Sequence, residues 1–320
     1  MHPVLFTIPF IDLPIYSYGV MLGLSLVVGW VLVMKLGEAD GLPSEKLAAC
    51  YIWTAVAAML GARLLYILTN LHEFANDSFI DLFNVRKGGL VAYGGFIGGF
   101  FGSWIYLRWQ KIRLLPWADV VVPTLASGLG ITRIGCFLYG CDYGKPIPAN
   151  APAWLQSIGV RFPNWSQKFD ELPRSVGGGD GVIHGSPAFL HHIHDGLVQA
   201  TSGFSDLVYP TQLMEVVNGW LLFAILMFAR KKTRFRGQIF LIFTMYYGVT
   251  RSLMEIIRGD TGRGGLWIFS TSQIVGIVTC AAAMVAWYFL SKSAKADPEA
   301  AMSLGPGAVK ETPRASKLGD

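Results

Sequence analysis

Charged residues are scarce in this sequence. Asp, Glu, Lys and Arg make up 15% of the 320 residues, whereas a soluble domain carries about 25%. Hydrophobic residues make up 52%, and the mean hydropathy is +0.44. A soluble fold of this size needs more charge to cover its surface. A disordered chain and a nucleic-acid-binding protein also carry more charge than this sequence does. The composition therefore indicates an integral membrane protein with no nucleic acid among its partners.

Cysteine is also rare, with four in the chain, which excludes a disulfide-rich scaffold. The N-terminal stretch MHPVLFTIPFIDLPIYSYG has no basic n-region and no small-residue cleavage site, so we do not expect a signal peptide. His191, His192 and His194 lack the His-x₃-His spacing of zinc hydrolases, and we expect a solvated loop there. The sequence therefore predicts neither a metal site nor a cofactor.

Seven continuous apolar stretches are long enough to cross a bilayer, because a ~30 Å core needs roughly 20 apolar residues per helix. They lie at about 16–34, 47–69, 88–107, 117–139, 211–229, 238–257 and 267–290. The runs are continuous rather than alternating, which argues against a β-barrel. We therefore predict an all-α, polytopic integral membrane protein with about seven transmembrane helices over residues 1–290.

Lysine and arginine predict the orientation, because cytoplasmic loops carry an excess of both. Fifteen lie in one set of loops and in the C-terminal stretch, and eight lie on the opposite side. This places the N-terminus outside and the C-terminus in the cytoplasm. Residues 140–210, rich in Pro, Gly and Trp, are expected to form an extracytoplasmic head or lid between the fourth and fifth helices. Residues 291–320 lack apolar periodicity and are expected to form a flexible cytoplasmic tail.

Three arginines, Arg63, Arg133 and Arg251, fall inside predicted helices. Each costs roughly 2.5–3.5 kcal/mol at the bilayer centre on insertion scales, so such residues face the protein interior and pair. All three lie about six residues before the outer end of their helix, which puts them at one depth. Arg251 and Glu255 are four residues apart and can pair on one helix face. For Arg63, which has no obvious partner in its helix, purely structural pairing is favoured.

Other polar residues gather at the same depth, namely Tyr18, Tyr93, Gln212, Glu215, Glu255 and Gln273. Guanidinium groups at the level of the lipid headgroups suit a phosphate diester, which arginine binds in a bidentate manner. The glycine runs at 88–99 and 125–144 allow close helix packing or a close approach of backbone amides to a ligand. For each arginine the alternative is an ion pair that only holds helices together. Taken together, these features predict an outward-facing pocket for an anionic phospholipid.

Three motifs resemble those of the bacterial prolipoprotein diacylglyceryl transferases. LASGLGITRIGCFLYGCDYGKP (125–146) is similar to the glycine-rich family signature with its Arg-x-Gly core. YPTQLMEVVNG (209–219) is similar to the Pro-Ser/Thr-Gln-Leu-x-Glu motif, and YGVTRSLMEIIR (247–258) to the Tyr-Gly-x-x-Arg-x-x-x-Glu-x-x-Arg helix. The opening PIYSYGVMLGL, the GGLxxxGGxIGG run and Gln273 also fit in order and spacing. The match covers nearly all of residues 1–290.

The resemblance implies a multi-pass enzyme of the bacterial cytoplasmic (inner) membrane, with seven helices and the N-terminus outside. Such enzymes transfer diacylglyceryl from phosphatidylglycerol to the lipobox cysteine of a prolipoprotein signal peptide, form a thioether and release glycerol phosphate. By position, Arg133 and Arg251 would bind the lipid phosphate and stabilise the leaving group, with Glu255 in the catalytic set. Phosphatidylglycerol, other membrane lipids and the prolipoprotein would be the partners. The lipid-contacting residues would include Tyr18, Gly144, Gln212, Glu215, Tyr247 and Gln273.

The chain departs from the family pattern at several positions. Tyr93 stands where many members have a histidine, and a tyrosine with a pKa of about 10 is a poor base unless a nearby arginine lowers that pKa. Tyr93 is counted in the catalytic set, and either it serves only to position a ligand, or the acceptor thiolate forms without that base, near the two arginines. Cys136 and Cys141 replace the usual Asn and Glu, and Tyr209 replaces a His. On a continuous helix the two cysteines point about 140° apart, so a disulfide between them requires the helix to end near Gly140.

Two other functions stay open. One is a phospholipid-binding or transport protein that uses the same pocket without transferase chemistry, and the other is a transferase with a non-protein acceptor. Transport requires access from both leaflets, whereas the cytoplasmic halves of the predicted helices carry few polar residues. The sequence therefore favours the enzyme.

Overall fold

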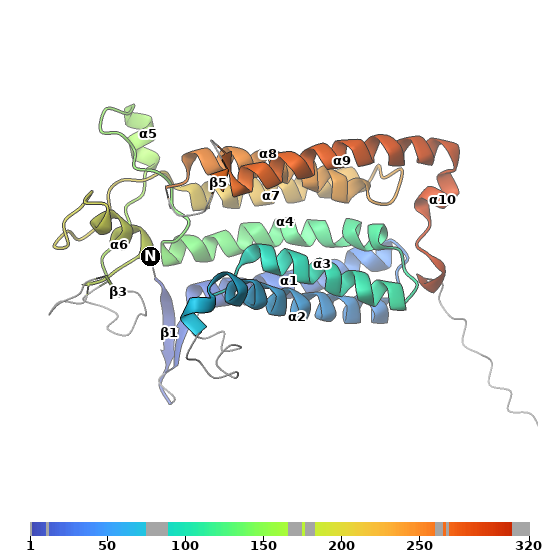
Figure 1. Cartoon of the computed structure of the whole chain (residues 1–320), viewed down its shortest axis with the longest axis horizontal. Coiled ribbons are helices and arrows are strands. Elements are labelled where there is room, and N and C mark those ends of the chain that lie inside the picture. Colours follow the sequence, from blue (N-terminus) through green and yellow to red (C-terminus); the bar gives the residue numbers. More distant parts are fainter. Residues whose placement is uncertain are drawn as a thin grey trace, which may run out of the picture. The chain divides into compact units, whose positions relative to one another are not determined.

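The computed structural model describes residues 2–10, 13–74, 89–165, 175–176, 183–259, 265–266 and 269–308. Seven long helices account for most of these residues (Figure 1). They are α1 (Ser17–Ala39), α2 (Ser44–Thr69), α3 (Ala92–Trp109), α4 (Leu114–Tyr139), α7 (Thr211–Arg230), α8 (Gln238–Ile257) and α9 (Thr271–Ala296). Shorter helices are η1 (Leu71–Phe74), α5 (Ala153–Ile158), α6 (Pro187–His194), α10 (Pro298–Met302) and η4 (Pro306–Ala308).

Three small antiparallel sheets were not predicted from the sequence. β1 (Val4–Ile8) pairs with β2 (Leu13–Tyr16) before the first helix. β3 (Ser175–Val176) pairs with β4 (Ile183–His184), and β5 (Gly265–Leu266) with β6 (Phe269–Ser270). The last two sheets have two residues per strand, which is too short for an alternating apolar pattern to be recognisable in the sequence.

Each predicted span coincides with one long helix, although α3 begins at Ala92 and α9 runs from Thr271 to Ala296. Five of these helices, α1, α2, α4, α7 and α9, are long and apolar enough to cross a membrane. Five glycines lower the hydropathy of α3, and polar residues such as Arg251 and Glu255 lower that of α8. The chain is therefore a mostly helical protein with several membrane-length apolar helices. The number seven and the N-outside orientation stay predictions.

The chain divides into two compact units, which the hydropathy of the sequence did not indicate. Unit 1 comprises residues 1–29, 122–233 and 238–292. Unit 2 comprises residues 30–121, 234–237 and 293–320. The helices α1, α4 and α9 each contribute residues to both units.

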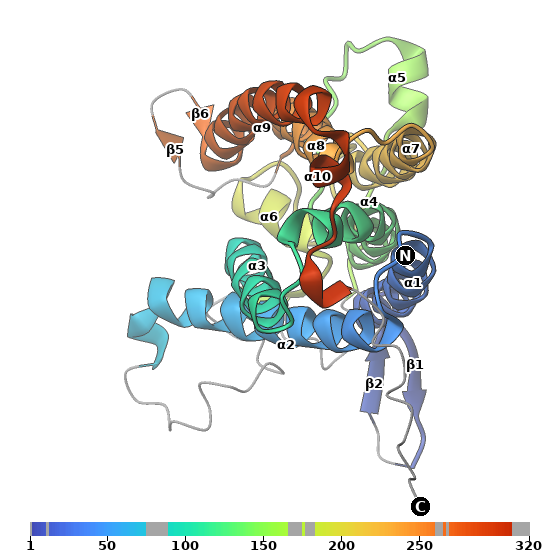
Figure 2. The ribbon, with the colours of Figure 1, turned by 90° about the vertical axis from the view of Figure 1, so that its right-hand side faces the viewer.

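In unit 2, α2 and α3 pack closely against each other (Figure 2). A Cβ atom on Gly61 would stand 2.4 Å from Gly94 O, and one on Gly98 would stand 2.2 Å from Ala57 O. Real Cβ atoms do not approach a carbonyl oxygen this closely, so these contacts require glycine. Close packing of this kind is how small residues join helices in a membrane. Part of the glycine run at 88–99 therefore serves helix packing, which was one of its two predicted uses.

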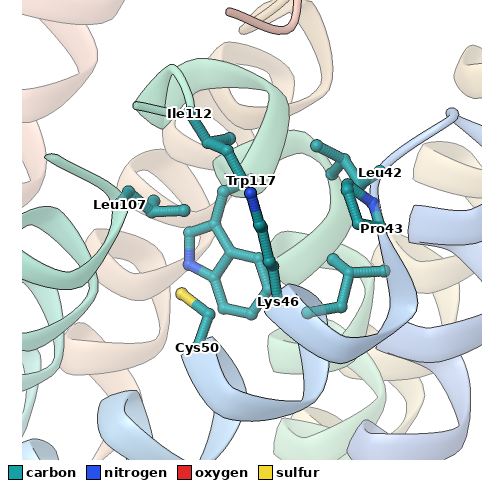
Figure 3. A pocket seen from close by; sticks show the side chains of 8 residues that line it. Leu42, Pro43, Lys46, Cys50, Leu107, Ile112 and Trp117 are labelled. Atoms are coloured by element: carbon teal, nitrogen blue, oxygen red, sulfur yellow. The ribbon is translucent and has the colours of Figure 1, made fainter. Parts of the chain in front are cut away.

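The core of unit 2 surrounds Trp117 and Cys50, which are both buried. Figure 3 shows a small pocket at this place, lined by Leu42, Pro43, Lys46, Leu47, Cys50, Leu107, Ile112 and Trp117. Lys46 is the charged residue of the lining, and its Nζ donates a hydrogen bond to Gly307 O at 2.8 Å. Because this ammonium group is already hydrogen-bonded and the other lining residues are apolar or a thiol, the pocket does not resemble a phosphate site.

Residues 291–308 are folded, where the sequence predicted a flexible tail. α9 continues past its predicted end, α10 follows, and Leu304 and Ala308 pack against the core of unit 2. The backbone N–H of Arg113 donates to Leu304 O at 2.9 Å. One buried and one partly buried apolar residue are too few to give the segment a detectable periodicity, which explains the difference. The rest of the predicted tail, 309–320, lies outside the described residues.

In unit 1, close helix contacts bring α4, α7, α8 and α9 together. A Cβ on Gly219 of α7 would stand 2.7 Å from Gly130 N of α4. A Cβ on Gly248 of α8 would stand 2.7 Å from Gly276 O of α9, and the converse distance is the same. α7 and α8 also lie side by side (Figure 1). A buried apolar cluster of Val122, Ala126, Leu222, Leu226 and Ile239 fills the space between α4, α7 and α8.

The head segment, residues 140–210, has an apolar core of its own within unit 1. Its buried members are Tyr143, Phe162, Ala188 and Val208. Isolated backbone bridges connect Val160 with Val208 and Pro163 with Phe204. The described part of the segment is therefore held by a few tertiary contacts and short backbone bridges.

The solvated loop expected at the histidines is wrong. His191, His192 and His194 lie on α6, and His192 is only 2% exposed. Ser186 caps this helix, because its Oγ accepts a hydrogen bond from Phe189 N at 3.3 Å, and proline follows at the first helical position. Serine followed by proline is a recognisable helix start in the sequence. The buried face of α6 explains why its histidines are not all solvated.

Candidate functional site

The C-terminal end of α4 places two cysteines beside an aspartate. Gly140 follows the helix with φ +83°, the left-handed conformation that commonly ends a helix. The backbone N–H groups of Gly140 and Cys141 both donate to Cys136 O, at 2.8 and 3.2 Å. In such a C-cap the side chains of the residues at the Cys136 and Cys141 positions meet. Asp142 follows directly, itself with φ +58°.

Arg133 lies one turn before Cys136 on α4 and connects two carboxylates. Its Nη1 pairs with Asp142 Oδ2, and its Nε pairs with Glu215 Oε2 on α7. The guanidinium group presents its donors in a rigid fork, so it can bind two acceptors at once. Arg133 therefore links the end of α4 to the first turns of α7.

Arg251 on α8 forms the pair with Glu255 that their spacing predicted. The distance from Arg251 Nη2 to Glu255 Oε2 is 2.8 Å. Arg251 Nη1 also lies 3.7 Å from Glu215 Oε1, and Nη2 donates to Ser272 Oγ of α9 at 3.3 Å. Glu215 is thus shared between the arginine of α4 and the arginine of α8.

A third arginine, Arg258, joins the same cluster at the end of α8. It pairs with Asp142 Oδ1, and its Nη1 lies 3.8 Å from Glu215 Oε1. Its side chain is only 4% exposed. The distribution of basic residues predicts that Arg258 lies in an outer loop, and no sequence pattern predicts a role for Asp142. The available signal was the helical spacing of Arg251, Glu255 and Arg258, which continues one face of α8 to the residue directly after it.

The arginine cluster, defined as Arg133, Arg251 and Arg258 with their carboxylate partners, is balanced in charge. Among the described residues its three guanidinium groups are matched by the carboxylates of Asp142, Glu215 and Glu255. Removing one partner of a buried ion pair costs about 3–5 kcal/mol, because the other charge stays buried without compensation. The cluster is therefore both a fixed set of cations and an important contributor to the packing of α4, α7 and α8.

The loop after α4 is held against the start of α7 by side-chain and backbone hydrogen bonds. Gln212 Nε2 donates to Cys141 O and Thr211 Oγ1 donates to Asp142 O, both at 2.8 Å. Gly144 N–H donates to Tyr209 O at 3.1 Å. A Cβ on Gly144 would stand 2.5 Å from Tyr209 O, so this position requires glycine. These contacts fix the backbone that carries Asp142.

Two polar atoms, one in the arginine cluster and one beside it, keep hydrogen-bonding capacity. Within the described part of the chain, buried Gln212 Oε1 and Arg251 Nη1 have no hydrogen-bond partner. Glu215 Oε1 lies 3.7 Å from Arg251 Nη1, which is too far for a hydrogen bond. Buried polar groups are normally satisfied, so one acceptor and one donor here are available to a ligand.

Two of the tyrosines selected from the sequence lie near the cluster. The Tyr18 hydroxyl on α1 is within electrostatic range of Arg133, Cys136, Cys141 and Asp142. Its backbone also touches α4, because a Cβ on Gly135 would stand 3.1 Å from Tyr18 Cα. Tyr247 on α8 is within electrostatic range of Arg133, and its ring stacks on Phe243 with centroids 5.6 Å apart.

Gln273 has a structural task at the start of α9. Its Oε1 accepts a hydrogen bond from Ser270 N at 3.0 Å, while its own N–H donates to Ser270 Oγ at 3.2 Å. This reciprocal pair is a capping box, and the Ser-x-x-Gln spacing that predicts it is present in the sequence. Its Nε2 also donates to Ser252 O of α8 at 3.5 Å.

Tyr93 and Arg63 belong to unit 2, not to the unit that carries the cluster. Tyr93 is the second residue of α3 and is 39% exposed. Arg63 Nη1 donates to Gly89 O at 3.1 Å, and its guanidinium carbon lies 5.2 Å from the centre of the Phe74 ring. These are local structural contacts of the kind that the sequence favoured for Arg63.

The four cysteines are all free thiols. α4 ends at Tyr139, as a disulfide between Cys136 and Cys141 would require, but none is present. A hydrogen-bonding contact with Cys136 and burial both raise the pKa of the Cys141 thiol. Cys141 is therefore protonated at neutral pH.

The fold and the cluster together define a class of protein. The chain is a helical protein with several membrane-length helices, and it holds a buried, charge-balanced polar site at the meeting point of α4, α7 and α8. Residues 3–289 match the family model described as "Prolipoprotein diacylglyceryl transferase". The chain belongs to this family.

Curated relatives bear the same activity in their names. A phosphatidylglycerol--prolipoprotein diacylglyceryl transferase of Clostridium tetani is 31% identical over 281 residues, which are 87% of this chain and 94% of that protein. The second such transferase of Clostridium perfringens is 31% identical over 83% of this chain and 87% of its own. A transferase of that name from Halalkalibacterium halodurans is 24% identical over 86% of this chain and 82% of its own.

Proposed function

We propose that this chain transfers the diacylglyceryl group of phosphatidylglycerol to the lipobox cysteine thiol of prolipoproteins. The reaction forms a thioether and releases glycerol phosphate, and it is the first step of lipoprotein maturation. The observation that carries the proposal is the arginine cluster in a chain of this family. Three guanidinium groups, one buried and two with side chains only 15–16% exposed, are held by fixed partners and suit a reaction in which negative charge develops on a departing phosphate ester.

Arg133 and Arg251 are the proposed phosphate-binding and leaving-group-stabilising residues. Arg251 Nη1, which has no hydrogen-bond partner among the described residues, is the donor available to a phosphate oxygen. Arg258 is added to the set, because it shares Asp142 with Arg133 and Glu215 with Arg251. The three carboxylates keep the cations in place before the lipid arrives, so that little reorganisation is needed during the reaction.

The remaining selected residues are assigned to binding and orientation. Gln212 Oε1 is a buried acceptor with no partner in the described ranges, and it suits a hydroxyl of the glycerol headgroup. Tyr18 and Tyr247 lie within electrostatic range of Arg133, and Glu255 holds Arg251. Gly144 allows the close backbone contact with Tyr209, and Glu215 holds the arginines. Gln273 acts indirectly, because it caps α9 beside Ser272.

Tyr93 has two proposed roles that experiment separates. Either its hydroxyl takes part in activating the acceptor thiol, or it only positions a ligand while the thiolate forms elsewhere. A Tyr93→Phe change removes the hydroxyl and keeps the ring. Lost transfer assigns the hydroxyl to the chemistry, and unchanged transfer removes it.

The proposed setting is the bacterial cytoplasmic membrane, crossed by about seven helices over residues 1–290 with the N-terminus outside. The head segment, 140–210, then lies outside the membrane between α4 and α7, where it can meet the prolipoprotein signal peptide. The C-terminal residues from 291 are cytoplasmic. Phosphatidylglycerol and the lipobox peptide are the proposed partners.

A transfer assay with purified protein tests the proposal. The full chain in detergent is mixed with phosphatidylglycerol and a lipobox peptide, and mass spectrometry follows the diacylglyceryl addition. Arg133→Ala and Arg251→Ala should each lower the rate roughly 10²–10³-fold, as removal of one preorganised donor does. Arg161→Ala, which removes a 54% exposed arginine side chain outside the cluster, is the matched control.

The same assay separates the alternative functions. Tight binding of phosphatidylglycerol by the intact protein with no peptide modification would favour a lipid-binding or transport protein. Diacylglyceryl release without peptide modification would favour a non-protein acceptor. Near-normal transfer by both arginine variants would show that the phosphate site lies elsewhere.

A further inference from the structure

Three metal-ligand atoms meet at the end of α4. The Sγ atoms of Cys136 and Cys141 and a carboxylate oxygen of Asp142 all lie within 4.8 Å of one another. We call this group the dithiol site. The family pattern has Asn and Glu where this chain has the two cysteines, so the thiol pair is a feature of this chain.

The positions of the three groups follow from the backbone. The C-cap around Gly140 brings the Cys136 and Cys141 side chains together, as described above. Gln212 and Thr211 hold the carbonyl groups of Cys141 and Asp142, each with a hydrogen bond of 2.8 Å. The dithiol site is therefore anchored to α7 and does not depend on a free loop.

Two thiolates and a carboxylate form a donor set that Zn²⁺ binds well. Catalytic zinc sites use three protein ligands and keep a fourth position open, whereas structural sites use four. Cys136, Cys141 and Asp142 supply three. Each oxygen of a carboxylate has two lone pairs, so Asp142 can bind a cation and still accept from Arg133 and Arg258.

The charges around the dithiol site suit a bound cation. Two thiolates, one carboxylate and a divalent ion carry a net charge of about −1. Arg133 Nη1 lies 3.8 Å from Cys136 Sγ, and Arg258 pairs with Asp142. A metal ion that binds here displaces the protons of both thiols.

We propose that Cys136, Cys141 and Asp142 bind a thiophilic divalent cation of the Zn²⁺ type, whose open position receives the acceptor thiol. This role rests on the proposed function, whereas the binding of the ion does not. A thiol coordinated to zinc loses its proton, which here passes to solvent. The thiolate sulfur then bonds to the carbon of the diacylglyceryl group that carries the phosphate. The C–O bond breaks, its electron pair leaves with glycerol phosphate, and nothing is oxidised or reduced.

A metal titration tests the site without any assay of activity. Metal-free full-length protein in detergent is titrated with Cd²⁺, which gives an ultraviolet charge-transfer band when thiolates bind it. We expect one Cd²⁺ per chain, with the band lost in Cys136→Ser and Cys141→Ser and kept in the matched control Cys280→Ser. No band in the wild-type protein, or a band that survives both serine changes, would overturn the proposal.

A second readout uses only the wild-type protein, in case the serine variants do not fold. Saturating Zn²⁺ should protect Cys136 and Cys141 from alkylation at least tenfold, as read by peptide mass spectrometry, and should leave Cys280 unprotected. Equal alkylation rates with and without Zn²⁺ would contradict the site.

The role in transfer is tested separately. Removal of metal with a chelator should lower the transfer rate at least tenfold, and Zn²⁺ should restore it. An unchanged rate in metal-free protein would overturn thiol delivery. If Cd²⁺ binds as expected but no preparation transfers diacylglyceryl, the proposed function fails while the metal site stands.

Discussion

Glu215 is the residue on which the three arginines converge. One of its oxygens pairs with Arg133, and the other lies 3.7 Å from Arg251 and 3.8 Å from Arg258. A single buried carboxylate therefore offsets part of the positive charge of the three guanidinium groups. In a low-dielectric interior its loss leaves guanidinium groups without compensation.

We predict that Glu215→Gln destabilises the protein even though the side-chain shape is kept. The free energy of unfolding should fall by about 3–5 kcal/mol, the cost of breaking a buried ion pair. Thermal unfolding in detergent measures this. Glu299→Gln, at an exposed position of α10, is the control and should change little. Equal stability of the two variants would contradict the role given to Glu215.

His192 makes the head segment sensitive to acid. Burial lowers the pKa of His192 below its usual value, against a smaller opposing effect of Asp206 and Asp195, and His191 adds to the lowering. The backbone N–H of Asp206 donates to His192 Nδ1 at 3.1 Å, which requires that nitrogen to be unprotonated. The folded state therefore favours the neutral imidazole.

The sign of the pH effect follows from that lowered pKa. The stabilising contribution is full above the unfolded-state value of about 6.5 and is lost as pH falls below it toward the folded-state pKa. We expect hydrogen exchange of residues 186–208 to accelerate at pH 5 relative to pH 7.5, after correction for intrinsic rates. His192→Gln should remove most of this acceleration, whereas a change at the 75% exposed His194 should leave it.

The sequence predicted some residue roles and not others, for a physical reason. The pair of Arg251 and Glu255 is local, and a spacing of four on a helix identifies it. Arg258 and Asp142 are 116 positions apart, and only the folded chain brings them together. The capping of α9 by Gln273 is local and was detectable from its spacing to Ser270, but its polarity within an apolar run suggested a ligand instead.

At the scale of elements, glycine contacts determine how the helices approach each other. α2 and α3 meet through Gly61, Gly94 and Gly98, where any Cβ would collide with backbone. The apolar runs predicted that these helices exist, because length and hydropathy are properties of one segment. Which glycines form the contact depends on the partner helix. The sequence alone therefore did not distinguish close helix packing from a close approach of the backbone to a ligand.

We predict that Gly98→Leu separates α2 from α3. A Cβ at Gly98 would stand 2.2 Å from Ala57 O, and overpacking of this kind costs about 1–3 kcal/mol or more. The melting temperature in detergent should fall. Gly23→Leu on α1, where nothing lies within 4 Å of the added Cβ, should melt close to the wild-type protein. A reversed order of the two variants would refute the interpretation.

Helix ends and short helices were harder to predict than the spans. α6 has eight residues, and α10 has five, which gives little room for a 3.6-residue pattern. The Ser-Pro start of α6 was a usable signal, but the closely spaced histidines His191, His192 and His194 suggested a solvated loop. The segment from 291 to 308 has few buried apolar residues, and backbone hydrogen bonds such as that from Arg113 N to Leu304 O connect it to the rest of unit 2.

At the scale of the whole molecule, the scarcity of charge predicted the class of protein, and the family match supports the reaction. The division into two units was not predicted, because hydropathy describes single segments and carries no information about which helices group together. The arginine cluster lies entirely within unit 1, with residues from α4, α7 and α8. We predict that this cluster serves diacylglyceryl transfer.

Complementation in living cells tests this role of the arginine cluster. The full chain is expressed in bacterial cells depleted of their own diacylglyceryl transferase, and growth and the prolipoprotein mass shift are measured. The wild-type chain and Arg161→Ala should restore both, whereas Arg133→Ala and Arg251→Ala should restore neither at equal membrane levels. A well-inserted wild-type chain that fails to restore the mass shift, or arginine variants that restore it fully, would contradict the account.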